Sequence, residues 1–217
     1  MYKTVVFDLD GTLLHTLPAL ADAGNRLCRK SGWPTHERQA SRYFAGNGIP
    51  KLVERLAPAD QRTPAVLEAA LADFKRDYGQ HLRDTTAPYP GIPEMLAKLK
   101  ANGVQLAVFS NKADALAKEV VKDYFGTQYF TIVRGQMTGV APKPAAEGTN
   151  ALLQTLHADP ASTLYVGDSN VDVETAHNAN LPCCGAVWGF RTREELNAAG
   201  AEYLAENSDE LYDVIMK

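Results

Sequence analysis

The sequence predicts an α/β fold in which a parallel β-sheet has helices on both faces and an all-helical insert interrupts it near its start. From residue 104 onward, short apolar runs alternate with helical patterns, which indicates parallel crossover units. Residues 18–84, in contrast, show helical patterns and no convincing strand. A chain of 217 residues, 45% hydrophobic and 22% charged, is long and apolar enough to bury a core.

Five apolar runs are the predicted strands. The first, Thr4–Leu9, is rich in β-branched residues and leads into an Asp-Gly pair, as is typical of a buried strand. Because parallel sheets bind ligands at the carboxyl ends of their strands, the residues that follow these runs are candidate site residues. The other four runs are Val104–Phe109, Tyr129–Val133, Thr163–Val166 and Cys184–Val187.

Helical patterns separate these strands. The helix that begins at Ile92 keeps its apolar residues on one face and stops at Asn102-Gly103, a pair typical of a helix C-terminus. Further helices are predicted over Ala145–His157, Val171–Ala179 and Arg193–Ala199.

The helical insert is expected over residues 15–85, so that residues 1–14 and 86–217 form the α/β core. Its clearest helix begins at Thr63-Pro64, where threonine is the predicted N-cap and proline occupies the first turn. The insert ends at Thr85–Gly91, a proline-rich segment suited to a stiff connector.

Charge, apolar runs and cysteines exclude several classes of protein. The formal net charge of −4 argues against a nucleic-acid-binding surface. No apolar run approaches the roughly 18 residues of a membrane span, and the N-terminus lacks a signal-peptide layout, so we expect a cytoplasmic protein without a membrane partner. The cysteines Cys28, Cys183 and Cys184 lack metal-ligand spacing and are expected to be reduced, buried thiols.

The segment Asp8-Leu9-Asp10-Gly11-Thr12 carries the strongest chemical signal. Side chains alternate along a strand, so Asp8 and Asp10 can point the same way. Two carboxylates held together either share a hard cation or divide into a nucleophile and a general acid-base. Gly11 permits a tight backbone after the strand, where the amides of Gly11 and Thr12 can face an anion. Taken alone, the segment could also be a solvated turn.

Polar residues follow two further predicted strands. Ser110 and Asn111 come directly after the second strand, at the expected start of a helix, where a hydroxyl and an amide are good donors to a phosphate oxygen. Ser110 could also serve there as an N-cap. Asp168 and Asp172 follow the fourth strand and are four residues apart, so they share one face of a helix that begins between them.

Lys143 lies between two prolines at the start of a predicted helix, which favours a fixed position over a mobile surface loop. Four aspartates gathered in one cleft require positive charge, which Lys143 and a divalent cation would supply. Magnesium fits because it binds one or two carboxylates and keeps positions for water and a substrate phosphate. The natural chemistry of such a cleft is attack by a carboxylate on phosphorus, through an aspartyl-phosphate.

Along the chain these four motifs come in the order Asp8–Thr12, Ser110, Lys143 and Gly167–Asp172, with a helical insert after the first. In this order they resemble the haloacid dehalogenase superfamily of phosphatases. The resemblance spans nearly the whole chain and implies a Rossmann-like parallel sheet core with an inserted all-helical cap domain. It implies that Asp8 is the nucleophile and that Asp10 protonates the leaving alkoxide and then activates water. Ser110 and Lys143 would hold the transferring phosphoryl group. The dehalogenase branch lacks the second aspartate, so Asp10 favours phosphate chemistry.

The resemblance also implies a bound Mg²⁺ ion. Its ligands would be Asp8, the backbone carbonyl of Asp10, and Asp168, with Asp172 supporting the site. Asn111 would assist as a donor on the phosphate side.

Within the insert, Arg42–Gly48 resembles the cap loop of phosphoglycolate phosphatases. Asn47 offers a donor there, and Arg42 or Lys51 could meet a substrate carboxylate. A turn between helices, with solvated cations, is the alternative. A mobile cap excludes water and sets specificity, and a small one favours a small phosphorylated metabolite, with 2-phosphoglycolate the best single candidate.

Other readings stay open at this point. A phosphosugar mutase shares the core and the placement of the cap. A receiver-like signalling module also uses an acidic metal site and a lysine, but it orders its motifs differently. His15 stands where the family commonly has an acidic residue, which leaves the exact substrate and the pH optimum open. The oligomeric state, monomer or homodimer, is equally open.

Overall fold

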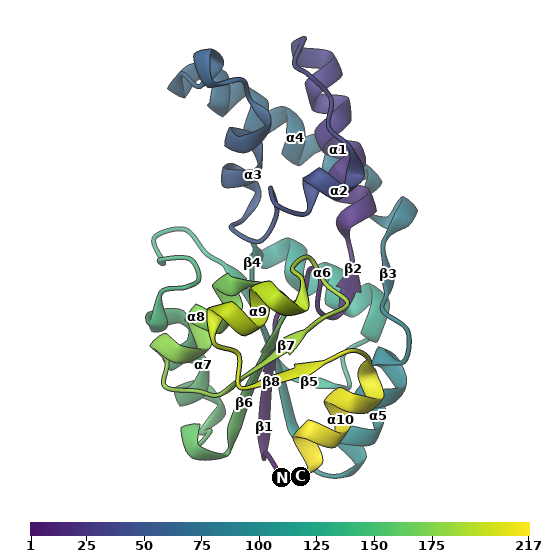
Figure 1. Cartoon of the computed structure of the whole chain (residues 1–217), viewed down its shortest axis with the longest axis vertical. Helices are drawn as coiled ribbons and strands as arrows, with labels where there is room; N and C mark the ends of the chain where they lie inside the picture. The colour runs from purple at the N-terminus through teal and green to yellow at the C-terminus, as the bar shows by residue number, and fades with distance from the viewer. The chain divides into compact units, whose positions relative to one another are not determined.

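The computed structural model describes residues 1–217, which form two compact units (Figure 1). The core unit comprises Met1–Leu14 and Pro88–Lys217, and the insert unit comprises His15–Ala87. The chain passes between the units at two short strands, β2 (Leu14–His15) and β3 (Ala87–Pro88).

The core unit is built on a six-stranded sheet in the order β5-β4-β1-β6-β7-β8, in which every neighbouring pair is parallel. The predicted parallel α/β fold is therefore confirmed. The sheet has one strand more than the five predicted, β8 at its edge. The strands are β1 (Thr4–Phe7), β4 (Gln105–Ala113), β5 (Phe130–Gln136), β6 (Thr163–Gly167), β7 (Cys183–Ala186) and β8 (Tyr203–Ala205).

The central strand β1 explains where polar side chains gather. Phe7 pairs with Val108 of β4 on one side and with Val166 of β6 on the other. All four residues of β1 are buried, as expected for a strand covered on both faces. Because the three strands run parallel and in register, the residues that follow them emerge at the same edge of the sheet.

One expectation about this edge is wrong. A helix was expected to begin at Ser110, but β4 continues to Ala113 and α6 begins only at Asp114. The strand extends because Ala113 still pairs with Gln136 of β5 beyond an irregularity in the ladder. Ser110 and Asn111 therefore lie within the strand, near its C-terminal end, and not at the start of a helix.

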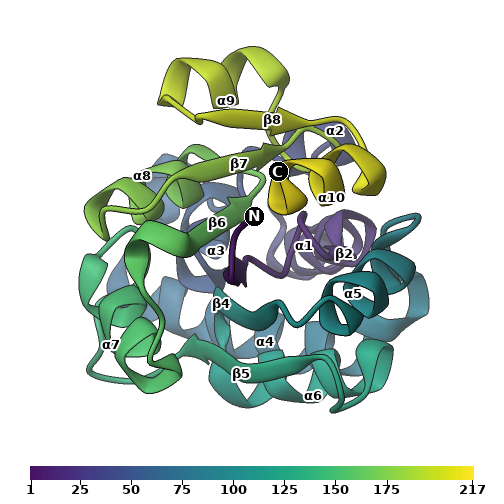
Figure 2. The same ribbon diagram turned by 90° about the horizontal axis from the view of Figure 1, so that it is seen from below.

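Helices cover both faces of the sheet (Figure 2). Helices α7 and α8 lie on one face, where they bury Val6, Ala107 and Tyr165 of the central strands, and α5 and α10 lie on the other. The helices predicted from Ile92 and over Ala145–His157, Val171–Ala179 and Arg193–Ala199 are all present. The core helices are α5 (Ile92–Ala101), α6 (Asp114–Phe125), α7 (Ala146–Leu156), α8 (Asn170–Asn178), α9 (Arg193–Ala199) and α10 (Ser208–Met216), with a 3-10 turn at Pro160–Ser162.

The insert unit is helical, as its sequence pattern indicates. The long helix α4 packs against α1, and Phe74 and Tyr78 stack with ring centroids 5.7 Å apart in its buried face. The Thr63 hydroxyl accepts a hydrogen bond from the backbone N of Val66, so the predicted N-cap is confirmed. Its helices are α1 (Leu17–Ser31), α2 (Arg38–Ser41), α3 (Ile49–Leu56) and α4 (Pro64–Thr85), with a 3-10 turn at Ala59–Gln61. No helix of the chain combines the length and the hydrophobicity that a membrane crossing needs.

Candidate active site

Asp8 is the first residue after β1. Its backbone N donates to the carbonyl of Val166 at 2.8 Å, which extends the ladder with β6 and fixes the aspartate at the sheet edge. The ammonium of Lys143 lies 2.9 Å from Asp8 Oδ1, yet this buried oxygen accepts no hydrogen bond of good geometry. Burial raises the pKa of Asp8 to about 6; Lys143 opposes this rise and Asp172 adds to it. The carboxylate is thus held at the end of the strand and next to a positive charge.

Lys143 is buried, so the alternative of a solvated loop cation is wrong. Its ammonium lies 2.9 Å from Asp8 Oδ1, donates to Asp172 Oδ1 at 2.7 Å, and sits 5.8 Å from the ring centroid of Tyr165. Burial lowers the pKa of Lys143, but the charges of Asp172 and Asp8 outweigh it and hold the pKa well above its ordinary value. Lys143 is therefore a fixed positive charge between two aspartates.

Asp168 follows β6 and is held at both oxygens. Oδ1 accepts a hydrogen bond from the Thr12 hydroxyl at 3.0 Å, and Oδ2 accepts one from the backbone N of Phe190 at 2.7 Å. A Cβ atom at Gly11 or at Gly189 would collide with the Asp168 side chain, so both glycines make room for it. Burial and the charges of Asp172 and Asp8 raise the pKa of Asp168 well above its ordinary value. The Thr12 hydroxyl is thus directed to Asp168, and a role of the Thr12 amide toward phosphate stays a prediction.

Asp172 closes the first turn of α8. Its Oδ2 accepts hydrogen bonds from the Ser169 hydroxyl at 2.7 Å, from the backbone N of Ser169 at 3.1 Å and from that of Asp168 at 3.2 Å. These contacts form a capping box, which satisfies amides at the helix N-terminus. Because Oδ1 accepts from Lys143, both Asp172 oxygens have partners inside the protein.

Asp8, Asp168 and Asp172 offer a group of carboxylate oxygens that lie within 4.8 Å of one another. All three side chains are buried, and Lys143 is the ammonium that faces them. Three carboxylates against one ammonium leave negative charge uncompensated. An all-oxygen donor set with excess negative charge fits a hard divalent cation.

The carboxylate of Asp10 contacts Lys112, which was not predicted as a site residue. Lys112 Nζ lies 3.0 Å from Asp10 Oδ1 and 3.1 Å from Oδ2. The Lys112 side chain is 2% exposed and that of Asp10 is 20% exposed. A signal was present in the sequence, because Lys112 stands two residues after Ser110 and therefore on the same side of an extended strand.

Ser110 and Asn111 lie on the last part of β4. Ser110 is buried, and its hydroxyl accepts a hydrogen bond from the backbone N of Lys112 at 3.3 Å. Asn111 Oδ1 accepts from the backbone N of Lys143 at 2.9 Å, and its Nδ2 donates to the Lys143 carbonyl at 3.3 Å. These two hydrogen bonds of Asn111 support the lysine, and its role toward phosphate stays a prediction.

The candidate residues of the insert unit lie on a loop between α2 and α3. Asn47 Oδ1 accepts from Arg55 at 2.9 Å, and Arg55 also donates to the carbonyl of Phe44 at 3.0 Å, so Arg55 orders this loop. The Arg42 guanidinium lies 5.8 Å from the ring centroid of Tyr43. Lys51 pairs with Glu54 within α3. Burial lowers the pKa of His15, and the positive charge of Arg38 adds to this effect. A role in substrate binding for Arg42 and Asn47 stays a prediction.

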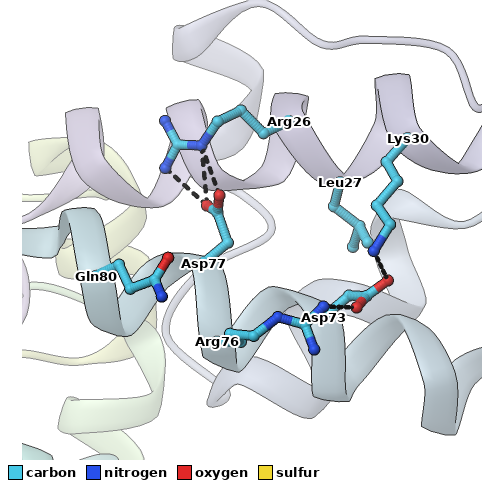
Figure 3. Close-up of a pocket in the computed structure, with 7 residues that line it drawn as sticks. All are labelled: Arg26, Leu27, Lys30, Asp73, Arg76, Asp77 and Gln80. Carbon is cyan, nitrogen blue, oxygen red and sulfur yellow. Dashed lines mark hydrogen bonds and ion pairs between the residues drawn. The ribbon is translucent and has the colours of Figure 1, made fainter.

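The insert unit also has a pocket along α1 and α4, in which basic and acidic side chains pair (Figure 3). Arg26 Nε contacts both oxygens of Asp77 at 2.9 Å, and Asp73 pairs with Lys30 and Arg76. Each of these three cations pairs with one of the two aspartates, which favours a role in packing α1 against α4.

A parallel α/β core that gathers buried aspartates and a lysine defines a class of α/β proteins with an acidic site at the carboxyl ends of the strands. The chain belongs to one family of that class, the haloacid dehalogenase-like hydrolases, whose sequence model matches residues 5–186. The resemblance inferred from the motifs is thereby confirmed, and the protein is an enzyme.

Similar proteins with known names support this assignment. The chain is 31% identical to a phosphoglycolate phosphatase of Chromobacterium violaceum over 98% of this chain and 96% of that protein. It is 33% identical to a phosphoglycolate phosphatase of Rhodospirillum rubrum over 93% and 86% of the respective chains. A crystal structure from Lactobacillus delbrueckii, of a protein provisionally described as a phosphoglycolate phosphatase, superposes with a TM-score of 0.93 at 28% identity and covers 99% of this chain and 98% of that one.

Proposed function

We propose that the protein is a Mg²⁺-dependent phosphatase of small phosphomonoesters that works through an aspartyl-phosphate. The observation that carries this proposal is the contact between Asp8 and Lys143 beside the buried Asp168. A carboxylate nucleophile toward a phosphate ester needs positive charge close by to offset the charge of the phosphoryl group. Asp8 and Lys143 have this arrangement.

In the first step, a carboxylate oxygen of Asp8 attacks phosphorus, and the bond between phosphorus and the ester oxygen breaks. The electron pair of that bond goes to the departing oxygen, which takes a proton from the carboxyl group of Asp10. Lys143 and the Ser110 hydroxyl hold the phosphoryl oxygens during the transfer.

In the second step, a water molecule attacks the phosphorus of the aspartyl-phosphate. Asp10, now a carboxylate, takes a proton from this water. The bond between phosphorus and the Asp8 oxygen breaks, which restores the Asp8 carboxylate and releases inorganic phosphate. Each proton that Asp10 gives in the first step is thus recovered in the second.

The residues that would hold Mg²⁺ are Asp8, Asp168 and the backbone carbonyl of Asp10. Asp172 would support them, because its Oδ2 already accepts three hydrogen bonds and its Oδ1 accepts one from the Lys143 ammonium. When bound, the ion supplies Lewis-acid stabilisation of the charge on the phosphoryl oxygens.

For the substrate we propose a small carboxylated phosphomonoester, with 2-phosphoglycolate as the first candidate. The names of the similar phosphatases support this choice. The insert unit would act as a cap that excludes water, with Arg42 and Asn47 reaching the substrate carboxylate. A cytoplasmic location is part of the same proposal.

The test is phosphate release from 2-phosphoglycolate and a panel of other small phosphomonoesters, with Mg²⁺ and with a chelator. We expect release that requires the metal, is abolished in Asp8→Asn, and is unchanged in Asp60→Asn, an exposed aspartate in a 3-10 turn. Acid-quenched wild-type enzyme should carry one phosphoryl group by intact-mass spectrometry. Full activity in Asp8→Asn would overturn the covalent step, and no release from any ester would overturn the function.

A further inference from the structure

Lys112 and Lys143 are the two buried lysines of the chain, and each takes one of the two aspartates that follow β1. Lys143 contacts Asp8 at 2.9 Å, and Lys112 contacts Asp10 at 3.0 and 3.1 Å. The two carboxylates are neighbours in the sequence but are held by different ammonium groups. This division separates the proposed nucleophile from the proposed acid-base.

Lys112 approaches the Asp10 carboxylate from the interior of the protein. Strands β1 and β4 are neighbours in register, so the residues that follow Phe7 and Val108 lie side by side. Lys112 belongs to the extension of β4 past Phe109, and its side chain is almost fully buried. Burying an ammonium is costly unless an acid meets it, so a lysine kept here implies a use for its charge and its geometry.

The geometry of the contact restricts Asp10 more than one hydrogen bond would. Both carboxylate oxygens lie within hydrogen-bond distance of one nitrogen atom, which opposes rotation of the carboxylate about its bond to Cβ. The Asp10 side chain nevertheless keeps 20% of its surface exposed, so it can still meet a ligand. A group that must give a proton at one atom and recover it from water benefits from such a fixed position.

We propose that Lys112 is a positioning residue that fixes the carboxylate of Asp10 for proton transfer to the departing oxygen. The proposal rests on the proposed phosphatase function. Lys112 would act through Asp10, so its contribution depends on how much the departing group needs a proton. An alkoxide needs one to leave, whereas p-nitrophenolate leaves without it.

The test compares kcat/KM for 2-phosphoglycolate and for p-nitrophenyl phosphate, because kcat/KM reports the steps up to departure of the leaving group. In Lys112→Met we expect a loss of about 10²-fold with 2-phosphoglycolate and a much smaller loss with p-nitrophenyl phosphate. Lys112→Arg should recover part of the loss. Lys118→Met is the matched control, since Lys118 forms an exposed ion pair with Asp114 on α6, and it should lose nothing on either substrate.

A second arm asks whether Lys112 acts through Asp10. In an Asp10→Asn background, Lys112→Met should cause no further loss with 2-phosphoglycolate. Equal losses on both substrates, no loss on either, or a full additional loss in the Asp10→Asn background would each overturn the proposal. Should Lys112→Met unfold, Lys112→Arg must show the same difference between the two substrates, and an equal effect on both overturns the proposal as well. If wild type does not hydrolyse 2-phosphoglycolate, the alkyl ester of the panel that it hydrolyses fastest takes its place in this comparison. A wild-type enzyme that hydrolyses no ester of the panel overturns the phosphatase function and this inference together, whereas an active wild type with equal losses overturns only the inference.

Discussion

Asn111 holds the backbone of Lys143 on both sides, accepting from its N at 2.9 Å and donating to its carbonyl at 3.3 Å. This contact ties the end of β4 to the loop that precedes α7. The ammonium of Lys143 reaches Asp8 and Asp172 from that loop. The position of the charge beside the proposed nucleophile therefore depends on an amide 32 residues away in the sequence.

Asn111→Ala should lower kcat by about 10²-fold, because it removes both contacts and lets the Lys143 backbone shift. The melting temperature should fall only slightly, since the side chain is partly buried and belongs to no apolar cluster. Asn197→Ala, an exposed position on α9, is the matched control and should keep wild-type activity. Wild-type kcat in Asn111→Ala would show that the two hydrogen bonds do not position the lysine.

Asp8 should make the metal-free protein less stable as the pH rises. Burial raises its pKa from 3.8 to about 6 in the folded state. Between these values the folded protein binds more protons than the unfolded chain, so the free energy of unfolding falls with rising pH through that window. Below it both states are protonated and nothing is lost, and above it the whole penalty is present.

Asp8→Asn cannot ionise, so its stability relative to metal-free wild type should grow from near zero around pH 4 to at most about 3 kcal/mol above pH 7. Urea unfolding followed by circular dichroism at several pH values measures this difference. Asp60→Asn, at an exposed position, is measured as the control variant. A stability gain that shrinks with rising pH would contradict the raised pKa.

Most of the core could be predicted from the sequence because its strands are short buried runs between amphipathic helices. β1, for example, is apolar on both faces and reads as a continuous run. β8 escaped prediction for the converse reason. It has three residues at the sheet edge, and Tyr203 and Leu204 are not fully buried, so no apolar run marks it.

The residues of the site were predictable wherever a strand end carried an acid or a hydroxyl, since parallel topology brings those ends together. Asp8, Lys143, Asp168 and Asp172 do meet in the structure. Lys112 was missed because the second strand was expected to stop at Phe109. The extension of β4 depends on pairing with β5 past an irregularity, which is a tertiary effect that no local pattern records.

Gly189→Ala should weaken metal binding although Gly189 is not itself a proposed metal ligand. A Cβ atom there would collide with the Cβ and Cγ of Asp168, whose carboxylate is held by Thr12 and Phe190. Displacement of a ligand held this tightly should raise the Mg²⁺ concentration for half-maximal activity by about 10- to 100-fold. A titration of phosphate release against Mg²⁺ measures this change.

Gly79→Ala is the control for that substitution. Gly79 lies in α4, and a Cβ atom there meets nothing within 4 Å. Alanine should stabilise the helix by about 0.5–1 kcal/mol and leave the Mg²⁺ dependence unchanged. An unchanged Mg²⁺ dependence in Gly189→Ala as well would mean that Asp168 does not bind the ion.

The three cysteines should be unreactive in the folded protein. Burial raises the pKa of Cys184 to about 12, with a further contribution from Glu210, and raises that of Cys183 well above its ordinary value. Burial also raises the pKa of Cys28, against an opposing effect of Arg29. Since the thiolate is the reactive form, none of these free thiols should react with a disulfide reagent in native protein at about pH 8, and all three should react in denaturant. Ser31→Cys, exposed at the end of α1, should add one fast-reacting thiol to the native protein, and a native wild-type thiol that reacts as fast would show that the core opens around it.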